Sequence, residues 1–153
     1  MIKLKGKLMK IKLLGGSDDR QGGTLPSKAT SGAACYDVYA RQDLYISPGY
    51  TALVPLGFSV QLPEDRVALI LPRSGMAYKH RVTVLNAPGV IDSDYRGECM
   101  AMLMNHGDTS HTITAGERVA QMMIVSLAGV VFEVVTKLDE TKRANGGFGS
   151  TGR

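Results

Sequence analysis

The sequence predicts an all-β domain, because many short extended segments follow one another and turn residues separate them. Glycine (18 residues) and proline (6 residues) recur about every eight to twelve residues, the spacing of an antiparallel sandwich or barrel. The 153 residues suit one domain that buries its own core, and 44% hydrophobic with 21% charged residues is a globular composition. No internal repeat or linker divides the chain before residue 138.

The expected elements are short and are bounded by proline or glycine. The first alternates lysine with isoleucine or leucine, as an edge strand does. The one expected helix covers 74–81 and has Ser74 as its N-cap candidate. The expected strands cover 8–14, 37–46, 51–54, 57–62, 66–71, 82–85, 98–105, 110–113, 118–127 and 130–137.

The strand at 98–105 contains the run Cys-Met-Ala-Met-Leu-Met, which is apolar on both alternating faces. Such a strand is expected to be buried on both sides. We interpret the methionines as filler of a core or of an interface between chains, in preference to a cofactor site.

The positive charge of the chain is concentrated at its N-terminus. The formal net charge is +4, from 18 Lys and Arg against 14 Asp and Glu, but five lysines lie within the first 14 residues. The remaining 13 basic and 14 acidic residues leave a net charge of −1, so the body of the protein is not basic. Tryptophan is absent and aromatic residues make up 6%, which argues against a platform for stacking nucleic acid. We therefore expect no nucleic-acid partner.

The two cysteines, Cys35 and Cys99, lie far apart, without a Cys-x-x-Cys motif or a histidine at ligand spacing. We expect neither a disulfide framework nor a zinc site, and a cytoplasmic setting fits best, with a nuclear or viral origin left open. No apolar run approaches the ~20 residues of a membrane span, and the N-terminus lacks the apolar stretch of a signal peptide, so we expect no membrane partner. Met9 is an alternative start, which would make residues 1–8 an extension.

The C-terminal segment 139–153 is polar and rich in glycine, so we expect a mobile arm attached to a folded domain at 1–138. Its Gly-Phe-Gly-Ser-Thr-Gly run matches the dinucleotide-binding pattern, but only one residue follows, so no helix can begin there and that interpretation is excluded. The glycines with Ser150 and Thr151 could still hold a phosphate, and Phe148 could stack on a base. The alternative is a disordered tail with an incidental phenylalanine.

The segment Pro72-Arg73-Ser74-Gly75 places a guanidinium, a hydroxyl and the free backbone N–H groups of a helix start close together. These groups are the parts of a clamp for phosphate or another oxyanion. A nucleophilic role for Ser74 is disfavoured because no Gly-x-Ser-x-Gly sequence surrounds it. The alternative is an ordinary helix cap beside a surface arginine.

The segment from Asn86 to Glu98 is the densest in polar and turn residues. Pro88-Gly89 predicts a turn, and a hairpin there would offer free backbone edges to the pairing face of a pyrimidine such as uracil. Asp92 follows two apolar residues, which would limit its hydration and fix its direction, as a general base for water requires. The alternative is an acidic turn with Tyr95 packed in the core.

These three segments, in this order, resemble the five-motif pattern of the trimeric dUTPase family. Ala33-Ala-Cys-Tyr-Asp-Val-Tyr-Ala40 resembles the first motif and Ala115-Gly-Glu-Arg-Val-Ala-Gln121 the fourth, so the likeness extends over the chain from Met9. The resemblance implies a β jelly-roll subunit, a homotrimer with active sites at subunit contacts, and hydrolysis of dUTP to dUMP and pyrophosphate. It also implies Mg²⁺ held by the substrate phosphates and water, with no direct protein ligand.

On this resemblance, Asp92 is the base that activates water for attack on the α-phosphorus, and Asp37 of the first motif supports the site. Tyr95 would lie under the deoxyribose and leave no space for a 2′-hydroxyl, and a neighbouring subunit's arm would close over the substrate. The implied substrate-binding residues are Arg73, Ser74, Gly75 and Gln121 for phosphate, Asn86, Val90 and Ile91 for uracil, Tyr95 and Met100 for the sugar pocket, and Arg143, Phe148, Gly149, Ser150 and Thr151 from the arm.

Two other functions remain open as alternatives to the dUTPase interpretation, and two residues depart from the sequence pattern of that family. A dCTP deaminase-like enzyme shares the fold and the Pro-Arg-Ser segment, and a non-catalytic nucleotide-binding protein of the same fold is a third candidate. Cys35 stands where the family more often has glycine, so that position need not be left-handed. Ala144 replaces a common glycine beside Arg143, which is expected to stiffen the arm.

Overall fold

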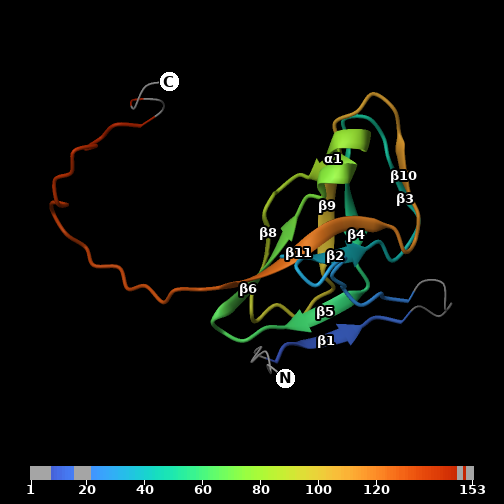
Figure 1. The fold of residues 1–153 in the computed structure, drawn as a ribbon, viewed down its shortest axis with the longest axis horizontal. Coiled ribbons are helices and arrows are strands. Elements are labelled where there is room, and N and C mark those ends of the chain that lie inside the picture. The colour runs from blue at the N-terminus through green and yellow to red at the C-terminus, as the bar shows by residue number, and fades with distance from the viewer. Residues whose placement is uncertain (1–7, 16–21, 148–149, 151–153) are drawn as a thin grey trace.

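The computed structural model describes residues 8–15, 22–147 and 150. This part of the chain forms an all-β jelly roll with one short helix, as expected from the sequence (Figure 1). The elements are β1 (Lys10–Leu13), β2 (Tyr36–Tyr39), β3 (Leu44–Ile46), β4 (Thr51–Pro55), β5 (Phe58–Gln61), β6 (Arg66–Leu71), α1 (Ser74–His80), β7 (Val82–Val84), β8 (Gly89–Ile91), β9 (Met100–Asn105), β10 (His111–Ile113) and β11 (Arg118–Ser126).

The strands pair in antiparallel fashion to form two principal sheets and two ribbons. The larger sheet has the order β2-β11-β6-β8, and the smaller has the order β4-β9-β7. The ribbons are β1 with β5 and β3 with β10. Because β8 is the last strand in its order, one of its edges is left without a strand partner among the described residues.

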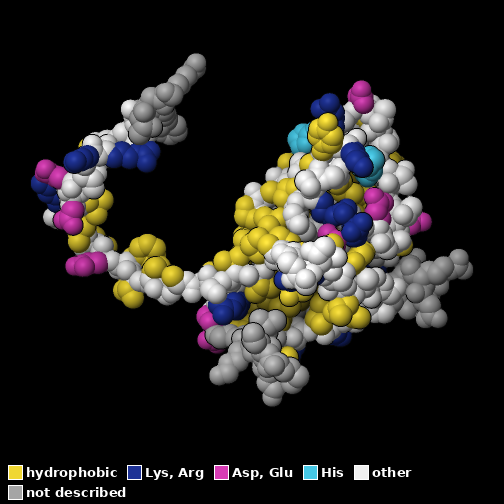
Figure 2. All heavy atoms as spheres, in the orientation of Figure 1, with side chains coloured by type: hydrophobic (Ala, Val, Ile, Leu, Met, Phe, Trp, Pro, Cys, Tyr) yellow, Lys and Arg dark blue, Asp and Glu magenta, His cyan; other side chains and the backbone are white. Residues whose placement is uncertain are grey.

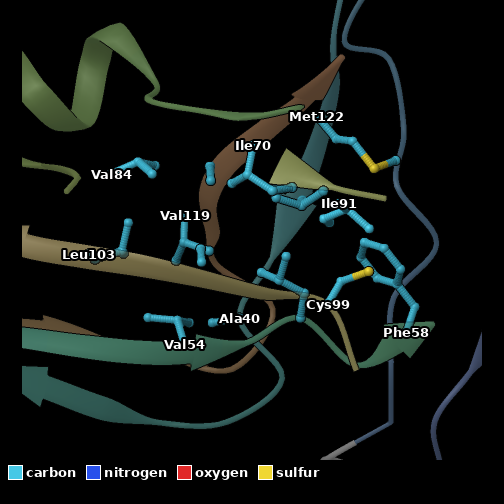
Figure 3. Close-up of a cluster of buried hydrophobic side chains, with 14 of the residues drawn as sticks. Ala40, Val54, Phe58, Ile70, Val84, Ile91, Cys99, Leu103, Val119 and Met122 are labelled. Carbon is cyan, nitrogen blue, oxygen red and sulfur yellow. The ribbon is translucent and has the colours of Figure 1, made fainter. Parts of the chain in front are cut away.

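The core consists of apolar side chains that alternate with more exposed residues along each strand. In β6 and β9, for example, alternate residues such as Ile70 and Leu103 are fully buried. They pack with Phe58 from β5 and with Val119 and Met122 from β11 (Figure 3). This core fixes the ends of β6 and β8, where the polar segments of interest begin.

The prediction of one strand at 37–46 is wrong, because two separate strands occupy that range. β2 pairs with β11, whereas β3 pairs with β10 in a different ribbon. Between them, Arg41 N–H donates to the Pro55 carbonyl at 2.9 Å and turns the chain from one sheet towards the other.

The prediction of a strand at 130–137 is also wrong. This segment leaves the sandwich after Ser126 and runs away from it without regular structure (Figures 1 and 2). Val131 and Val134 are 98% and 99% exposed. A strand needs a partner for its backbone N–H and C=O groups, and no described strand lies beside this segment.

The N-cap of the helix lies one residue earlier than expected, at Arg73 and not at Ser74. Arg73, with extended backbone, occupies the N-cap position without a side-chain cap hydrogen bond, and Ser74 is the first helical residue. The helix ends at His80. The next residue, Arg81, is the C-cap: it has a left-handed φ of 55° and donates its N–H to the Ala77 carbonyl. The Ser74 hydroxyl is therefore not used as a cap and stays exposed.

The strand β9 is not buried on both sides within one chain, contrary to expectation. Ala101, Leu103 and Asn105 are fully buried, but Met100 is 37% exposed, and Met102 and Met104 are half-buried. One face of β9 packs in the core, and its methionine face lies at the surface.

No helix in the described part of the chain is long and apolar enough to cross a membrane.

Asn105 is a buried polar residue that joins three backbone segments. Its Nδ2 donates to the carbonyls of Ile46 and Thr109 at 2.9 and 2.8 Å, and its Oδ1 accepts from Gly107 N–H at 2.8 Å.

Asn105→Ala leaves these three groups without their partner and should lower the free energy of unfolding by about 3 kcal/mol in urea titrations. The matched change at the exposed neighbour, His106→Ala, should leave it nearly unaltered; equal effects of the two would contradict the structural role of Asn105.

Candidate functional site

Two adjoining cavities lie on either side of the end of β8. The first, of about 190 Å³, is lined by Val90, Ile91, Asp92, Tyr95, Glu98, Cys99 and Met100. The second, of about 170 Å³, shares three of these residues and adds Leu53, Ile70, Asn86, Gly89 and Met102. The structure therefore brings together the base, sugar and catalytic residues that the sequence pointed to: Asn86, Val90, Ile91, Asp92, Tyr95 and Met100.

The backbone of β8 lies at the boundary of the two cavities. It pairs with β6 on one side through the register Gly89 with Ile70 and Ile91 with Ala68. The expected hairpin at 86–91 is absent, because the strands on either side of the turn, β7 and β8, belong to different sheets. The turn is nevertheless compact, because the Asn86 side-chain amide lies close to Gly89: a Cβ built on Gly89 would lie 3.4 Å from Asn86 Nδ2.

Asp92 follows directly after β8 and is exposed. The expectation that two preceding apolar residues would limit its hydration is wrong within one chain, because Ile91 turns into the core while Asp92 turns to the cavity. Its backbone carbonyl accepts from Tyr95 N–H at 3.3 Å, which closes a turn. Asp92 makes no ion pair within the described residues, so its carboxylate oxygens are available to water or to a ligand.

Tyr95 borders the first cavity and is not a core residue. It is 44% exposed, and its hydroxyl donates to the Glu98 carbonyl at 3.1 Å. The ring lies against the backbone of Gly97, where a Cβ would come within 2.6 Å of Tyr95 Cζ. The alternative of Tyr95 packed in the core is therefore excluded, and Gly97 is what allows the ring to lie here.

A second polar cluster lies at the start of α1. The Asp37 carboxylate accepts from Arg73 Nε at 3.2 Å and from Arg118 Nη1 at 3.2 Å, so it bridges two guanidinium groups. Arg73 Nη1 donates to the Arg118 carbonyl at 2.7 Å. Gln121 Nε2 donates to the Pro72 carbonyl at 2.7 Å, beside Arg73. Ser74 and Gly75 are exposed at the first turn of the helix, so the expected phosphate-binding residues form one group.

The two clusters do not meet within one chain. Ile91 pairs with Ala68, which precedes Arg73 by five residues along β6 and its continuation. Because β8 runs antiparallel to β6, Asp92 lies one residue further from Arg73 than Ile91 does, and at ~3.3 Å per residue this separates Asp92 from the Arg73 group by about 20 Å. The residues expected to bind base and sugar and those expected to bind phosphate therefore form two separate groups, or half-sites, within one chain.

The arm residues are described in part. Arg143 and Ala144 lie in a turn, in which Arg143 Nε donates to the Gly146 carbonyl at 2.9 Å. Ala144 has a left-handed φ of 44°, which glycine would adopt more easily, whereas Cys35 is not left-handed. Ser150 is exposed, and the described part of the arm up to residue 147 runs away from the sandwich (Figure 1). Phe148, Gly149 and Thr151 lie outside the described residues.

The chemistry of the cavity excludes a thiol nucleophile. Burial first, and the nearby charge of Glu98 second, raise the pKa of the Cys99 thiol to about 11, so Cys99 stays protonated. Within residues 8–15, 22–147 and 150, no group of three or more His, Cys, Asp or Glu side chains could hold a metal ion.

Sequence reasoning missed three residues of these clusters. Arg118 bridges to Asp37, and Arg41 pairs with Glu98 beside the first cavity. Arg118 lies inside the segment that resembles the fourth motif, and this position could have identified it as a candidate site residue. Arg41 and Glu98 are 57 residues apart, and nothing in the local sequence joins them.

Comparisons with known proteins agree with this geometry. The family model described as dUTPase matches residues 21–152. The deoxyuridine 5′-triphosphate nucleotidohydrolase of Gloeothece citriformis is 47% identical over 128 residues, which cover 84% of this chain and 88% of the relative. The enzyme of the same name from Clostridium tetani is 44% identical over 145 residues, covering 95% of this chain and 97% of the relative.

Solved structures show the same fold. A dUTPase of Staphylococcus bacteriophage 80alpha with dUpNHpp has a TM-score of 0.86 at 23% identity and covers 97% of this chain and all of its own. A dUTPase from phage phi11 of S. aureus, described as showing the coordination of a structural Mg(II) ion, has a TM-score of 0.78 at 19% identity. The alignment with the phi11 protein covers 88% of this chain and 100% of that one.

The contact of Tyr95 with Gly97 predicts the effect of one added methyl group. In Gly97→Ala the new carbon would lie 2.6 Å from Tyr95 Cζ and 3.0 Å from Cε2, closer than carbon atoms approach. The ring should swing away, so that a crystal structure of the variant shows the Tyr95 hydroxyl separated from the Glu98 carbonyl. Gly32→Ala, where a methyl meets nothing within 4 Å, is the matched control. A Tyr95 ring that stays in place in Gly97→Ala would contradict this account.

Proposed function

The chain belongs to the dUTPase family, and from this premise we propose that Asp92 activates the water with which this dUTP diphosphatase splits dUTP into dUMP and pyrophosphate. The observation that carries the proposal is the position of an unpaired carboxylate at the mouth of a cavity bordered by a free strand edge and a tyrosine. Neither alternative from the sequence, deamination of dCTP or binding without turnover, is favoured by a particular feature of this site.

Uracil is the base that the β8 edge would hold. Its pairing face presents an acceptor, a donor and an acceptor, and the free edge of a strand presents N–H and C=O groups that can match them. We assign this recognition to the segment of Val90 and Ile91. The Asn86 amide lies over Gly89 at the same edge and adds a side-chain donor and acceptor. Tyr95 and Met100 would then enclose the deoxyribose and leave no space for a 2′-hydroxyl.

The reaction at the α-phosphorus requires one proton to be removed from water. Asp92 would accept that proton as the water oxygen forms its bond to phosphorus, while the bond to the bridging oxygen breaks and its electron pair leaves with pyrophosphate. The lack of an ion pair at Asp92 among the described residues supports this role, because a carboxylate paired with an arginine would be a poorer base.

The phosphates would bind Arg73, Ser74, Gly75 and Gln121, with Asp37 as the support that orients Arg73. Asp37 and the Arg118 carbonyl hold the Arg73 guanidinium from two sides, so little side-chain entropy is lost when it binds an anion. The described residues supply no metal cage, which fits Mg²⁺ carried by the phosphates and water. When bound, Mg²⁺ would neutralise phosphate charge and fix the geometry of the triphosphate.

The two half-sites would be joined in a homotrimer. About 20 Å separates Asp92 from the Arg73 group in one chain, so a shared substrate requires that two subunits contribute. The surface methionines of β9 offer an apolar face for such a contact. The arm after residue 138 would reach a neighbour's site with Arg143, Phe148, Gly149, Ser150 and Thr151.

Asp92→Asn should reduce kcat for pyrophosphate release from dUTP by about 10²- to 10⁴-fold, because the amide cannot accept the proton. Binding of dUTP should change little, since the amide has nearly the same shape. Asp94→Asn, an exposed neighbour in the same turn, is the matched control and should stay active. Near-normal turnover of Asp92→Asn would remove Asp92 from this role.

Removal of the residues after Lys142 should lower kcat/KM for dUTP at least about 100-fold, because the arm's phosphate contacts and its exclusion of water are lost. Sedimentation should show that the truncated chain still forms a trimer, since the arm makes no part of the sandwich. Deletion of residues 1–8, which precede β1, is the control and should preserve the rate. A truncated protein with an unaffected rate would contradict the role of the arm.

A further inference from the structure

Glu98 lies where the loop that carries Asp92 and Tyr95 returns to the sandwich. Its two carboxylate oxygens each lie 3.2 Å from Arg41 Nη1, and Oε1 also accepts from Gly57 N–H at 2.9 Å. The Arg41 and Glu98 side chains are about a quarter exposed, at 24% and 25%, so water screens their attraction only in part. Three hydrogen bonds thus hold one carboxylate in a fixed direction.

The partners of Glu98 are themselves rigid. Arg41 N–H donates to the Pro55 carbonyl at 2.9 Å, and Gly57 has a left-handed φ of 75° in the turn between β4 and β5. Leu56 N–H donates to the Cys99 carbonyl at 3.1 Å, and Cys99 N–H donates to the Phe58 carbonyl at 2.8 Å. The carboxylate is therefore bonded to a buried part of the fold, in which both the N–H and the carbonyl of Cys99 are hydrogen-bonded.

The other side-chain hydrogen bonds of this loop remain inside the loop. The Tyr95 hydroxyl donates to the Glu98 carbonyl at 3.1 Å, and Arg96 Nη1 donates to the carbonyls of Ser93 and Tyr95. The side chain of Glu98 is what connects this closed set of bonds to β4, β5 and the end of β2. Any displacement of Glu98 moves the carbonyl that orients the Tyr95 ring.

We propose that Glu98, held by Arg41 and Gly57, is a positioning residue for discrimination between deoxyribose and ribose. It acts through Tyr95: the clamp fixes the Glu98 carbonyl, the carbonyl fixes the Tyr95 hydroxyl, and the ring then closes the space that a 2′-hydroxyl would need. The proposal rests on the function proposed above for Tyr95. A selective pocket needs this support because one hydroxyl oxygen is small compared with the movement of an unheld loop.

Glu98→Gln tests the clamp with little change of shape. The amide oxygen can still accept from Gly57, but the charge that holds Arg41 is lost. The ratio of kcat/KM for dUTP to that for UTP should fall about tenfold, mainly through better use of UTP, because a loosened ring no longer excludes the 2′-hydroxyl. Asp65→Asn is the matched control: it removes the acid of another partly buried arginine pair, at the start of β6, and should preserve the ratio.

Arg41→Met is the second variant, because it keeps the apolar stem that lies near Gly57 while removing the guanidinium. It should lower the ratio as Glu98→Gln does, and the double variant should be no worse than either alone. In a Tyr95→Phe background, which already lacks the hydroxyl, Glu98→Gln should no longer change the ratio.

Circular dichroism and sedimentation establish that each variant is folded and assembled before the rates are compared. If Glu98→Gln and Arg41→Met lower thermal stability but keep the dUTP to UTP ratio, the clamp is only structural and the inference is overturned. If Glu98→Gln changes the ratio equally in the Tyr95→Phe background, Glu98 does not act through Tyr95 and the inference is again overturned. Failure of the proposed function is distinguishable, since the unaltered protein would then show no preference for dUTP.

Discussion

The Asp37 carboxylate is the interaction on which the phosphate half-site depends, because it joins three strands of the larger sheet at one point. Asp37 lies in β2, Arg118 begins β11, and Arg73 continues from β6, so one acid ties together the edge and centre of that sheet. Its side chain is 14% exposed, a depth at which two charge-assisted hydrogen bonds offset much of the cost of removing the carboxylate from water. Without it, two guanidinium groups would repel each other beside the helix start.

The sequence predicted most of the fold because proline and glycine mark where each strand ends. It failed where pairing partners decide the outcome. The range 37–46 reads as one extended segment, yet its halves pair with β11 and β10, and local composition does not encode that division. The range 130–137 has the composition of a strand, but a strand also needs a neighbour, and the described chain supplies none.

The site was predictable in its parts and not in its arrangement. The motif residues gather at two places, since Asn86 to Tyr95 and Arg73 to Gly75 are each local in sequence. The separation of these places follows from the register of β6 with β8, which sequence alone does not give. Arg41 and Glu98 were missed because their contact spans 57 residues and depends on a turn at Gly57. Long-range side-chain pairs of this kind become visible only with the fold.

The division between rigid and exposed parts of the molecule follows from what each must recognise. Selection of one pairing face, or exclusion of one hydroxyl, requires atoms held to within about 1 Å, and misplacement by that distance can cost about 100-fold. In the proposed function these tasks fall to β8 and to a loop that Glu98 joins to the core. Attraction between a guanidinium and a triphosphate falls off slowly with distance and tolerates several geometries. Groups proposed for that task can therefore lie on an exposed segment, as Arg143 does, without loss of selectivity for the base and the sugar.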